Sequence, residues 1–147
     1  MHTTNHTFRL GTASALAILL SCYLLNANAD ATEVQDISKI NSGSRVEENK
    51  RVGDVFSVNG GIRIQHGAIA SEIGTVNDGI NIEDDAEIDA AEIVNGGIDV
   101  GENVTINGSL RTMSGGINTN SGTVVHDDLV TVNGKIRLRN TLLGLDV

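Results

Sequence analysis

Aromatic residues are almost missing from this sequence, which has 147 residues but only one Tyr, two Phe and no Trp. A core built on large aromatic rings is therefore excluded. Pro is absent, and the single Cys cannot form a disulfide within the chain. Basic residues are also scarce, since ten Lys and Arg stand against 19 Asp and Glu and give a formal charge of −9. That charge argues against nucleic acid or an anionic membrane as the main partner.

The first 29 residues predict a leader. Arg9 is the only formally charged residue before Asp30, residues 10–25 are mainly apolar, and Asn26-Ala27-Asn28-Ala29 follows. A basic start, an apolar stretch and an Ala-x-Ala end are typical of a secretory signal peptide cleaved after Ala29, so the mature chain is expected to be periplasmic or secreted. A second interpretation stays open: Leu19-Leu20-Ser21-Cys22 resembles a lipobox, and lipidation of Cys22 would anchor the protein to a membrane.

Beyond the leader, the sequence repeats. Val58-Asn59-Gly60-Gly61-Ile62 recurs in related form at residues 76–80, 94–98, 113–117 and 132–136, at steps of 18, 18, 19 and 19. A degenerate copy, Ile40-Asn41-Ser42-Gly43, lies 18 residues before the first of these and marks one more unit. The six units are residues 39–56, 57–74, 75–92, 93–111, 112–130 and 131–147. Self-similarity at a fixed period is typical of a solenoid, in which each unit buries its apolar face against its neighbours.

A shorter period of six residues lies inside each unit and predicts the secondary structure. Many members of this series have an apolar neighbour two positions earlier, as in Ile62 with Ile64 and Ile80 with Ile82. A spacing of two is the alternation of a strand, with both residues on one face. In a helix, steps of six would spread these residues around the cylinder and leave no buried face. Helix is therefore excluded.

Three short strands per unit, separated by Gly-containing corners, describe one coil of a parallel β-helix. We expect residues 39–147 to form this all-β domain as a single-stranded, three-sided helix of about six coils, with residues 30–38 as an N-terminal cap or linker. A right-handed turn is expected from the general preference of parallel crossover connections. The six-residue series expected to line the interior is Ile40, Val46, Val52, Val58, Ile64, Ala70, Val76, Ile82, Ile88, Val94, Val100, Ile106, Met113, Thr119, Val125, Val132 and Leu138.

One corner carries the same residue type in most units: Asn41, Asn59, Asn77, Asn95 and Asn133. Ser114 interrupts this series. Stacked coils would place these amides one above another, where they can form a hydrogen-bonded ladder. Ordinary turn chemistry is the alternative explanation for Asn at such positions.

Two segments, Arg51-Val52-Gly53-Asp54-Val55 and Ile106-Asn107-Gly108-Ser109-Leu110, look like the recurring pattern of the bactofilin family of polymer-forming bacterial proteins. The resemblance covers residues 39–143. It implies a right-handed β-helix that assembles end to end, without nucleotide or catalysis. Bactofilins are typically cytoplasmic, so the leader makes this chain resemble an exported variant with Val-Asn-Gly-x-Ile repeats.

The six-residue step also resembles the left-handed hexapeptide β-helix of acyltransferases, as in Val100-Gly101-Glu102-Asn103-Val104-Thr105. Such an enzyme would need a His as general base between subunits, and His66 is the candidate. We favour a solvated corner His, because no cluster of partners accompanies it in the sequence. A polysaccharide-active β-helix enzyme is a further alternative, disfavoured because six short coils leave little room for a substrate groove.

Two acidic runs, Glu83-Asp84-Asp85 and His126-Asp127-Asp128, offer oxygen ligands for a hard cation such as Ca²⁺. Neither run matches an EF-hand loop or the Gly-rich repeat that binds Ca²⁺ in stacked coils. Charge runs are usually solvated faces. We therefore predict no catalytic residue, no metal site and no cofactor.

These observations predict a non-enzymatic scaffold or binding protein of the bacterial envelope, whose partner is a protein or another envelope component. The ends of a β-helix present backbone N–H and C=O groups that can pair with another chain. The first coil has Ser44 and Lys50 where apolar residues are expected, whereas Lys135-Ile136-Arg137-Leu138-Arg139 keeps its alternation in the last. We expect a monomer, or a homodimer joined tail to tail through residues 131–147, and no long filament.

The leader gives the first testable prediction. Export should be followed by cleavage between Ala29 and Asp30, since the Ala-x-Ala end lies directly before this bond. The intact mass of the exported protein measures the cleavage site. A mass that corresponds to a lipid-bearing chain starting at Cys22 would contradict this site and show a membrane-anchored protein instead.

Overall fold

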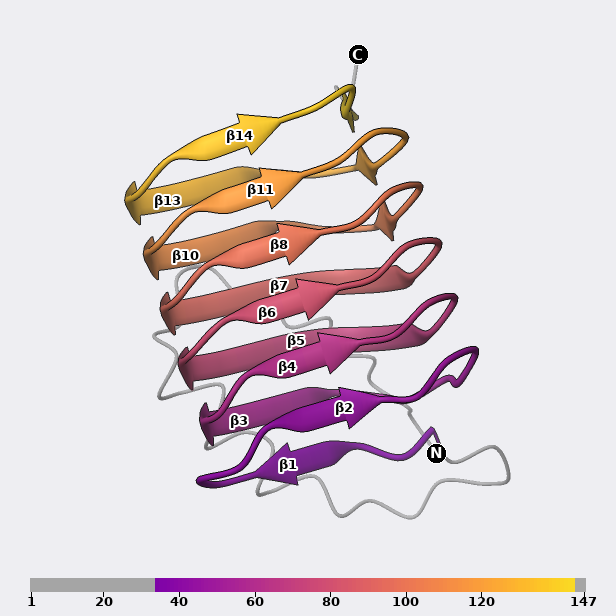
Figure 1. Ribbon diagram of the computed structural model, residues 1–147, viewed down its shortest axis with the longest axis vertical. Coiled ribbons are helices and arrows are strands. Elements are labelled where there is room, and N and C mark those ends of the chain that lie inside the picture. The colour runs from indigo at the N-terminus through magenta and orange to yellow at the C-terminus, as the bar shows by residue number, and fades with distance from the viewer. Residues whose placement is uncertain (1–33, 145–147) are drawn as a thin grey trace, which may run out of the picture.

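The computed structural model describes residues 34–144, and every regular element in that range is a strand. The strands of successive coils run parallel and stack as a β-solenoid of about six turns (Figure 1). The leader of residues 1–29, with Cys22, lies outside the described residues. Within residues 34–144, no helix is long and apolar enough to cross a membrane.

Fifteen strands follow one another along the chain, most of them only a few residues long. They are β1 (Ile37–Lys39), β2 (Ser44–Val46), β3 (Val55–Asn59), β4 (Ile62–Ile64), β5 (Ile69–Asn77), β6 (Ile80–Ile82), β7 (Glu87–Asn95), β8 (Ile98–Val100), β9 (Thr105–Ile106), β10 (Leu110–Ser114), β11 (Ile117–Thr119), β12 (Val124–Val125), β13 (Leu129–Asn133), β14 (Ile136–Leu138) and β15 (Leu142–Leu143). Gly, Asn and Asp between them end each strand, because these residues favour turns.

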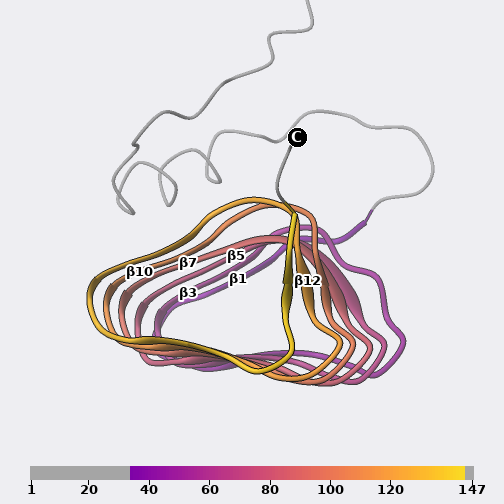
Figure 2. The same cartoon turned by 90° about the horizontal axis from the view of Figure 1, so that it is seen from above.

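Hydrogen bonding sorts the strands into two parallel sheets. Sheet B contains six strands, in the order β14-β11-β8-β6-β4-β2, and sheet A contains the other nine. Paired residues lie 18 apart in the earlier coils, as Ile62 with Ile80, and 19 apart in later ones, as Ile98 with Ile117, before the step returns to 18 between β12 and β15. The sequence repeat is therefore one coil, and the predicted all-β stack is confirmed. Seen from above, the coils overlie one another around a common interior (Figure 2).

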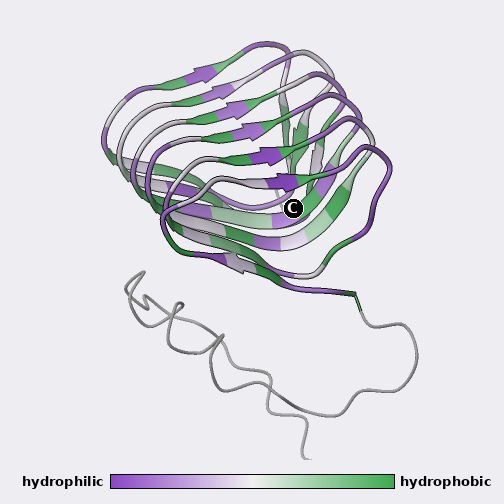
Figure 3. Ribbon diagram, turned by 60° about the horizontal axis from the view of Figure 1, so that its bottom comes forward, coloured by the Kyte–Doolittle hydropathy of each residue, from purple (hydrophilic) through white to green (hydrophobic). Residues whose placement is uncertain are grey.

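An apolar column fills this interior. The inward pairs predicted for sheet B are all buried: Ile62 with Ile64, Ile80 with Ile82, and Ile98 with Val100. The residue between the members of each pair is exposed. Figure 3 shows hydrophobic and hydrophilic segments recurring at matching positions of successive coils. Phe56 lies outside the core cluster and packs against Gly74, so the column itself contains no aromatic ring in the described range.

The long strands of sheet A correct part of the predicted register. In β5, Ala70 and Ile73 are both buried although only Ser71 and Glu72 separate them. Strict alternation would put two residues three apart on opposite faces. The strand therefore turns around the solenoid at Ser71 and Glu72 while its pairing with the next coil continues. Strand β7 repeats this break between Ile88 and Ala91.

In each coil, the one member of the six-residue series that directly follows this turn does not face the interior, and the prediction for these members was wrong. Val58, Val76 and Val94 are only partly buried, whereas the residue before each of them, such as Thr75 or Ile93, faces the core. Ile40, Met113 and Val132 belong to the same part of the series and are 72%, 55% and 69% exposed. At this turn, two residues instead of one separate consecutive inward positions. This shifts the register by one position, so the side chains that follow the turn lie on the opposite face from the predicted one.

The two extra residues of the later coils fall at the same turn. Two residues separate Ile88 from Ala91, whereas three separate Ile106 from Leu110 and three separate Val125 from Leu129. Where the turn has three residues, the continuous strand is interrupted. Sheet A therefore divides after β7 into a branch of β9, β12 and β15 and a branch of β10 and β13.

Another turn, which we call the left-handed corner, places one residue of each coil at positive φ. These residues are Asn49, Gly67, Asp85, Asn103, Gly122 and Asn140, with φ values between 45° and 78°. Only Gly, Asn and Asp adopt this conformation routinely, and the six coils use no other residue type here.

The predicted Asn ladder is confirmed at the end of sheet A for Asn41, Asn59, Asn77 and Asn95, whereas no side-chain hydrogen bond within residues 34–144 extends it to Asn133. The Asn59 amide nitrogen donates to Asn41 Oδ1 at 2.7 Å, Asn77 donates to Asn59 at 2.8 Å, and Asn95 donates to Asn77 at 3.2 Å. Each amide thus joins two neighbouring coils. Strand β1 begins at Ile37, inside the segment expected to be a cap, and pairs with β3. The right-handed turn and the three-sided cross-section stay predictions.

The alternation within β6 gives a stability prediction. Ile82→Asp should destabilise the protein by about 4 kcal/mol or more, because it buries an unpaired charge in the apolar column. Asn81→Asp, one residue earlier on the exposed face, should change the free energy of unfolding by less than about 0.5 kcal/mol. Urea denaturation of both variants measures the difference. Equal damage from the two substitutions would contradict the register of sheet B.

Candidate functional site

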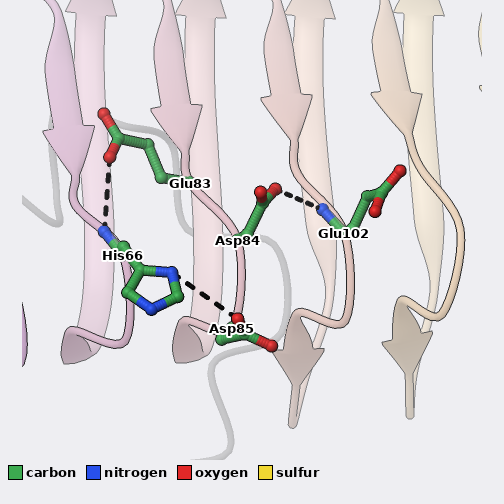
Figure 4. A network of polar contacts seen from close by, with 5 residues as sticks. All are labelled: His66, Glu83, Asp84, Asp85 and Glu102. Carbon is green, nitrogen blue, oxygen red and sulfur yellow. Dashed lines mark hydrogen bonds and ion pairs between the residues drawn. The ribbon is translucent and has the colours of Figure 1, made fainter.

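The left-handed corner brings together the first group of predicted candidates, and Figure 4 shows how they lie. The His66 backbone N–H donates to Glu83 Oε2 at 3.3 Å, and His66 Nδ1 lies 3.5 Å from Asp85 Oδ2. The Glu102 backbone N–H donates to Asp84 Oδ1 at 2.7 Å. Each of these contacts joins one coil to the next.

The three carboxylates of Glu83-Asp84-Asp85 are therefore directed to two different coils instead of one point. Glu83 and Asp85 contact the preceding coil, and Asp84 contacts the following one. The side chains of His66 and Asp85 are 50% and 52% exposed. In the part of the chain that the structure describes, no group of three or more His, Cys, Asp or Glu is placed to hold a metal ion. This geometry favours a solvated, coil-joining role over a base or a cation site.

The second acidic run, His126-Asp127-Asp128, lies at the turn of sheet A between β12 and β13. Asp127 Oδ2 accepts a hydrogen bond from the Ser109 hydroxyl at 2.9 Å. One coil earlier, the Asn107 amide donates to Asp89 Oδ1 at 3.2 Å and to Glu87 Oε1 at 3.1 Å. The polar side chains at this turn thus also join neighbouring coils.

The same turn carries a group of acids that the sequence reasoning missed. We call it the acidic bend; it comprises Asp36, Asp54, Glu72, Asp89 and Glu92. Asp36 Oδ1 accepts the Asp54 backbone N–H at 2.9 Å, and Asp54 Oδ1 accepts the Glu72 backbone N–H at 3.2 Å. The step of 18 residues from Asp36 to Asp54 and Glu72 was the signal in the sequence that could have shown this column.

The acidic bend holds three carboxylates at raised pKa. The pKa of Asp54 is raised mainly by loss of surrounding water, and repulsion by Asp36 and Asp89 raises it further. The hydrogen bond from the Glu72 backbone N–H acts in the opposite direction and lowers this pKa. The pKa of Glu72 is raised first by loss of water and then by Asp54, Asp89 and Glu92. The pKa of Glu92 is raised by loss of water, while Arg111 opposes this. These groups repel one another at neutral pH and so oppose stacking.

The last coil leaves apolar residues uncovered at the C-terminal end. Ile136, Leu138 and Leu143 occupy inward positions of the column, yet they are 39%, 41% and 45% exposed. Their partners one coil earlier, Ile117, Thr119 and Val125, are at most 1% exposed. We call these three residues the open end. It also presents the unpaired backbone edges of β13, β14 and β15, because no described strand pairs beyond them.

The two ends of the solenoid differ in burial and charge. In the first coil, Ser44 and Val46 occupy the inward positions of β2 and are 3% and 1% exposed. The Ser44 hydroxyl is buried there without a hydrogen-bond partner among the described residues. Lys135, Arg137 and Arg139 lie in the last coil, and residues 129–144 include no Asp or Glu. The C-terminal end is therefore both apolar and basic.

No family model, curated protein or solved structure matches this chain.

The repulsion within the acidic bend predicts that removing one of its charges stabilises the folded protein, by an amount that depends on pH. Because the folded-state pKa of Glu72 is raised, the folded chain binds its proton more tightly than the unfolded chain. The charged form of Glu72 thus lowers the free energy of unfolding at neutral pH. This destabilisation disappears as pH falls below the pKa that Glu72 has in the unfolded chain. Glu72→Gln should stabilise the protein near neutral pH because it removes this charge. The gain should be only about 0.5 kcal/mol, since water screens the largely exposed side chain, and it should vanish at about pH 4.

Thermal unfolding at both pH values measures this effect. Glu48→Gln, the same change on an exposed residue of the first coil, is the matched control and should shift neither midpoint. An equal gain at both pH values would mean that the side-chain amide acts by another route than charge removal.

Proposed function

We propose that this chain is an exported, non-enzymatic scaffold or binding protein of the bacterial envelope, which associates through its open C-terminal end. The proposal includes a right-handed solenoid whose repeat is of the bactofilin type. The solenoid supplies a rigid rod, since every coil is joined to the next by backbone pairing and by side-chain ladders. Such a rod can bind partners through its faces and its ends without a catalytic site.

The observation that carries the proposal is the exposure of the open end. Ile136 and Leu138 belong to the same column as residues that are completely buried one coil earlier. Covering them with another coil or strand would bury apolar surface and satisfy the edge of β14 at the same time. A membrane surface would cover the apolar groups but could not satisfy the backbone edge. A protein strand therefore suits this end better than lipid.

A second copy of the chain, joined tail to tail, is the partner in this proposal. A twofold contact pairs β14 with its own copy in antiparallel direction, so Ile136 meets Leu138 of the partner on the apolar side. The first coil is a poorer template, because its inward positions are already buried. Assembly then stops at two chains through residues 131–147 and does not continue into a filament.

The charge of this end makes the dimer dependent on salt. Lys135, Arg137 and Arg139 of both copies lie near the contact, and like charges repel less when salt screens them. A homodimer should therefore tighten as salt rises. Binding of an acidic partner at the same end would weaken under the same conditions.

Light scattering of the exported protein measures its molar mass. We expect the mass of two chains, and we expect the double variant Leu138→Ser, Leu143→Ser to weaken dimerisation about 100-fold or more, since the dimer contains both leucines twice and each loses about half of a full side-chain burial. Circular dichroism of the variant checks that the solenoid still forms.

Val132→Ser is the matched control. Val132 lies in the same coil and is more exposed than either Leu, but its position is on the outer face and not in the column. It should leave the dimer unchanged. Filaments in the intact protein, or a monomer at every concentration and salt level, would contradict the tail-to-tail dimer.

A further inference from the structure

The outer face of sheet B carries one polar residue per coil in exact register. Parallel pairing places Arg45 beside Arg63, Arg63 beside Asn81, and Asn81 beside Asp99. Asn118 and Arg137 continue this column. All six side chains point away from the core, because each lies between two residues at inward positions of its strand.

The column begins with two like charges on neighbouring strands. Strands of one sheet lie about 4.8 Å apart, so the Arg45 and Arg63 stems start within that distance of each other. Like charges opposite each other destabilise a sheet. Among residues 34–144, no hydrogen bond or ion pair engages Arg45, and Arg63 has one long contact, with its Nε 3.9 Å from Glu83 Oε1. The pair is therefore not neutralised within the described chain.

Both arginines border a shallow hollow of about 420 Å³. Its floor is formed by backbone at Gly43, Gly61 and Gly79, which have no side chains to fill the space. Asn81 and Asp99 form the far side, and a second hollow that shares these two residues continues toward Asn120. A small ligand group can thus approach the backbone directly beside two guanidinium groups.

The negative groups at the hollow are already engaged. Asp78 Oδ1 accepts the Gly79 backbone N–H at 2.8 Å, and Asp99 Oδ1 accepts the Asn118 amide at 2.6 Å. Neither is bound to an arginine. Their charge also limits where an anion can lie. Asp99 repels it from the far side, and Asp78, which lies beside Gly61, repels it from that part of the floor, so the position closest to both the Arg45 and Arg63 guanidinium groups is the favourable one.

We propose that Arg45 and Arg63 form a binding site for an oxyanion group, held between their guanidinium planes above the glycine floor. Carboxylate, phosphate and sulfate groups fit this chemistry, because Arg presents a planar fork of donors that binds two oxygens at once. The Asn81 amide is placed to donate to a hydroxyl or a further oxygen next to the anion. In an envelope, such a group can come from an acidic saccharide or from a phosphate-bearing headgroup. This site does not depend on the open end.

The distribution of charge along the chain supports this position. Five of the ten Lys and Arg lie within residues 39–63, namely Lys39, Arg45, Lys50, Arg51 and Arg63. Residues 64–128 contain one basic residue, Arg111, and twelve acidic ones. An anion is therefore repelled by the middle of the rod and attracted to its two ends: the first two coils, where Glu47, Glu48 and Asp54 offset part of the basic charge, and the last coil, with Lys135, Arg137 and Arg139. Of these two ends, only the first has basic side chains bordering the hollow.

Isothermal titration of the exported protein at about 0.15 M salt tests the site, with inorganic phosphate in one arm and trigalacturonate in the other. Binding of either probe supports the oxyanion site, and the tighter probe identifies the source of the anion. Arg45→Gln and Arg63→Gln should each weaken binding at least ~10-fold, as expected for loss of hydrogen bonds to a charged group. Both positions are exposed, so circular dichroism should remain that of the parent protein.

Arg51→Gln is the matched control, since it removes the same charge from the same end but does not border the hollow. It should change the affinity less than about 2-fold at this salt concentration. The proposal is overturned if neither probe binds, or if Arg51→Gln weakens binding as much as Arg45→Gln, which would mean a diffuse electrostatic attraction without a site.

Discussion

The structure depends on one constraint, the parallel pairing of each coil with the next at a fixed step of 18 or 19 residues. This step brings identical positions of neighbouring coils together, so each residue meets its own equivalent. Isoleucine then stacks on isoleucine in sheet B, and Asn59 and Asn77 form a ladder of amides. The same rule stacks charges, as at Arg45 with Arg63 and at Asp54 with Glu72. Repetition thus stabilises apolar and amide positions and costs stability at charged ones.

The turn of sheet A shows how the step is kept when the chain length varies. Strands β5 and β7 pass this turn with two residues between inward positions, and later coils pass it with three. The extra residue interrupts the strand but leaves the pairing on both sides intact. Two of the acids gathered here, Asp36 and Asp54, accept hydrogen bonds from backbone N–H groups of the next coil. These contacts offset part of the repulsion between the stacked carboxylates.

Sequence periodicity could predict the coil, its length and the interior of sheet B, because each depends on spacing alone. The inward positions Ile62, Ile80 and Ile98 and the ladder of Asn59 on Asn41 follow from the 18-residue step. The six-residue series failed at Val58, Val76 and Val94, because it treats every turn as equal in length. The acidic bend was missed for a related reason: Asp54, Glu72 and Asp89 are far apart in sequence and lack the appearance of a run. Glu83-Asp84-Asp85 looked like a site because adjacent acids stand out, yet its side chains contact different coils.

The two ends of the rod follow from the same constraint, with opposite results. A coil in the middle has both edges paired, so its inward residues need only be apolar. At the first end, a small Ser44 takes the place that Ile62 has in the next coil, and its hydroxyl is buried without a hydrogen-bond partner in residues 34–144. At the last end, Ile136 and Leu138 keep the residue types of the interior, although no described coil covers them. Repeat proteins usually close a solenoid with polar residues at their caps, whereas the described last coil has Ile136 and Leu138 at its inward positions. The tail-to-tail contact proposed above would cover these two side chains in place of a polar cap.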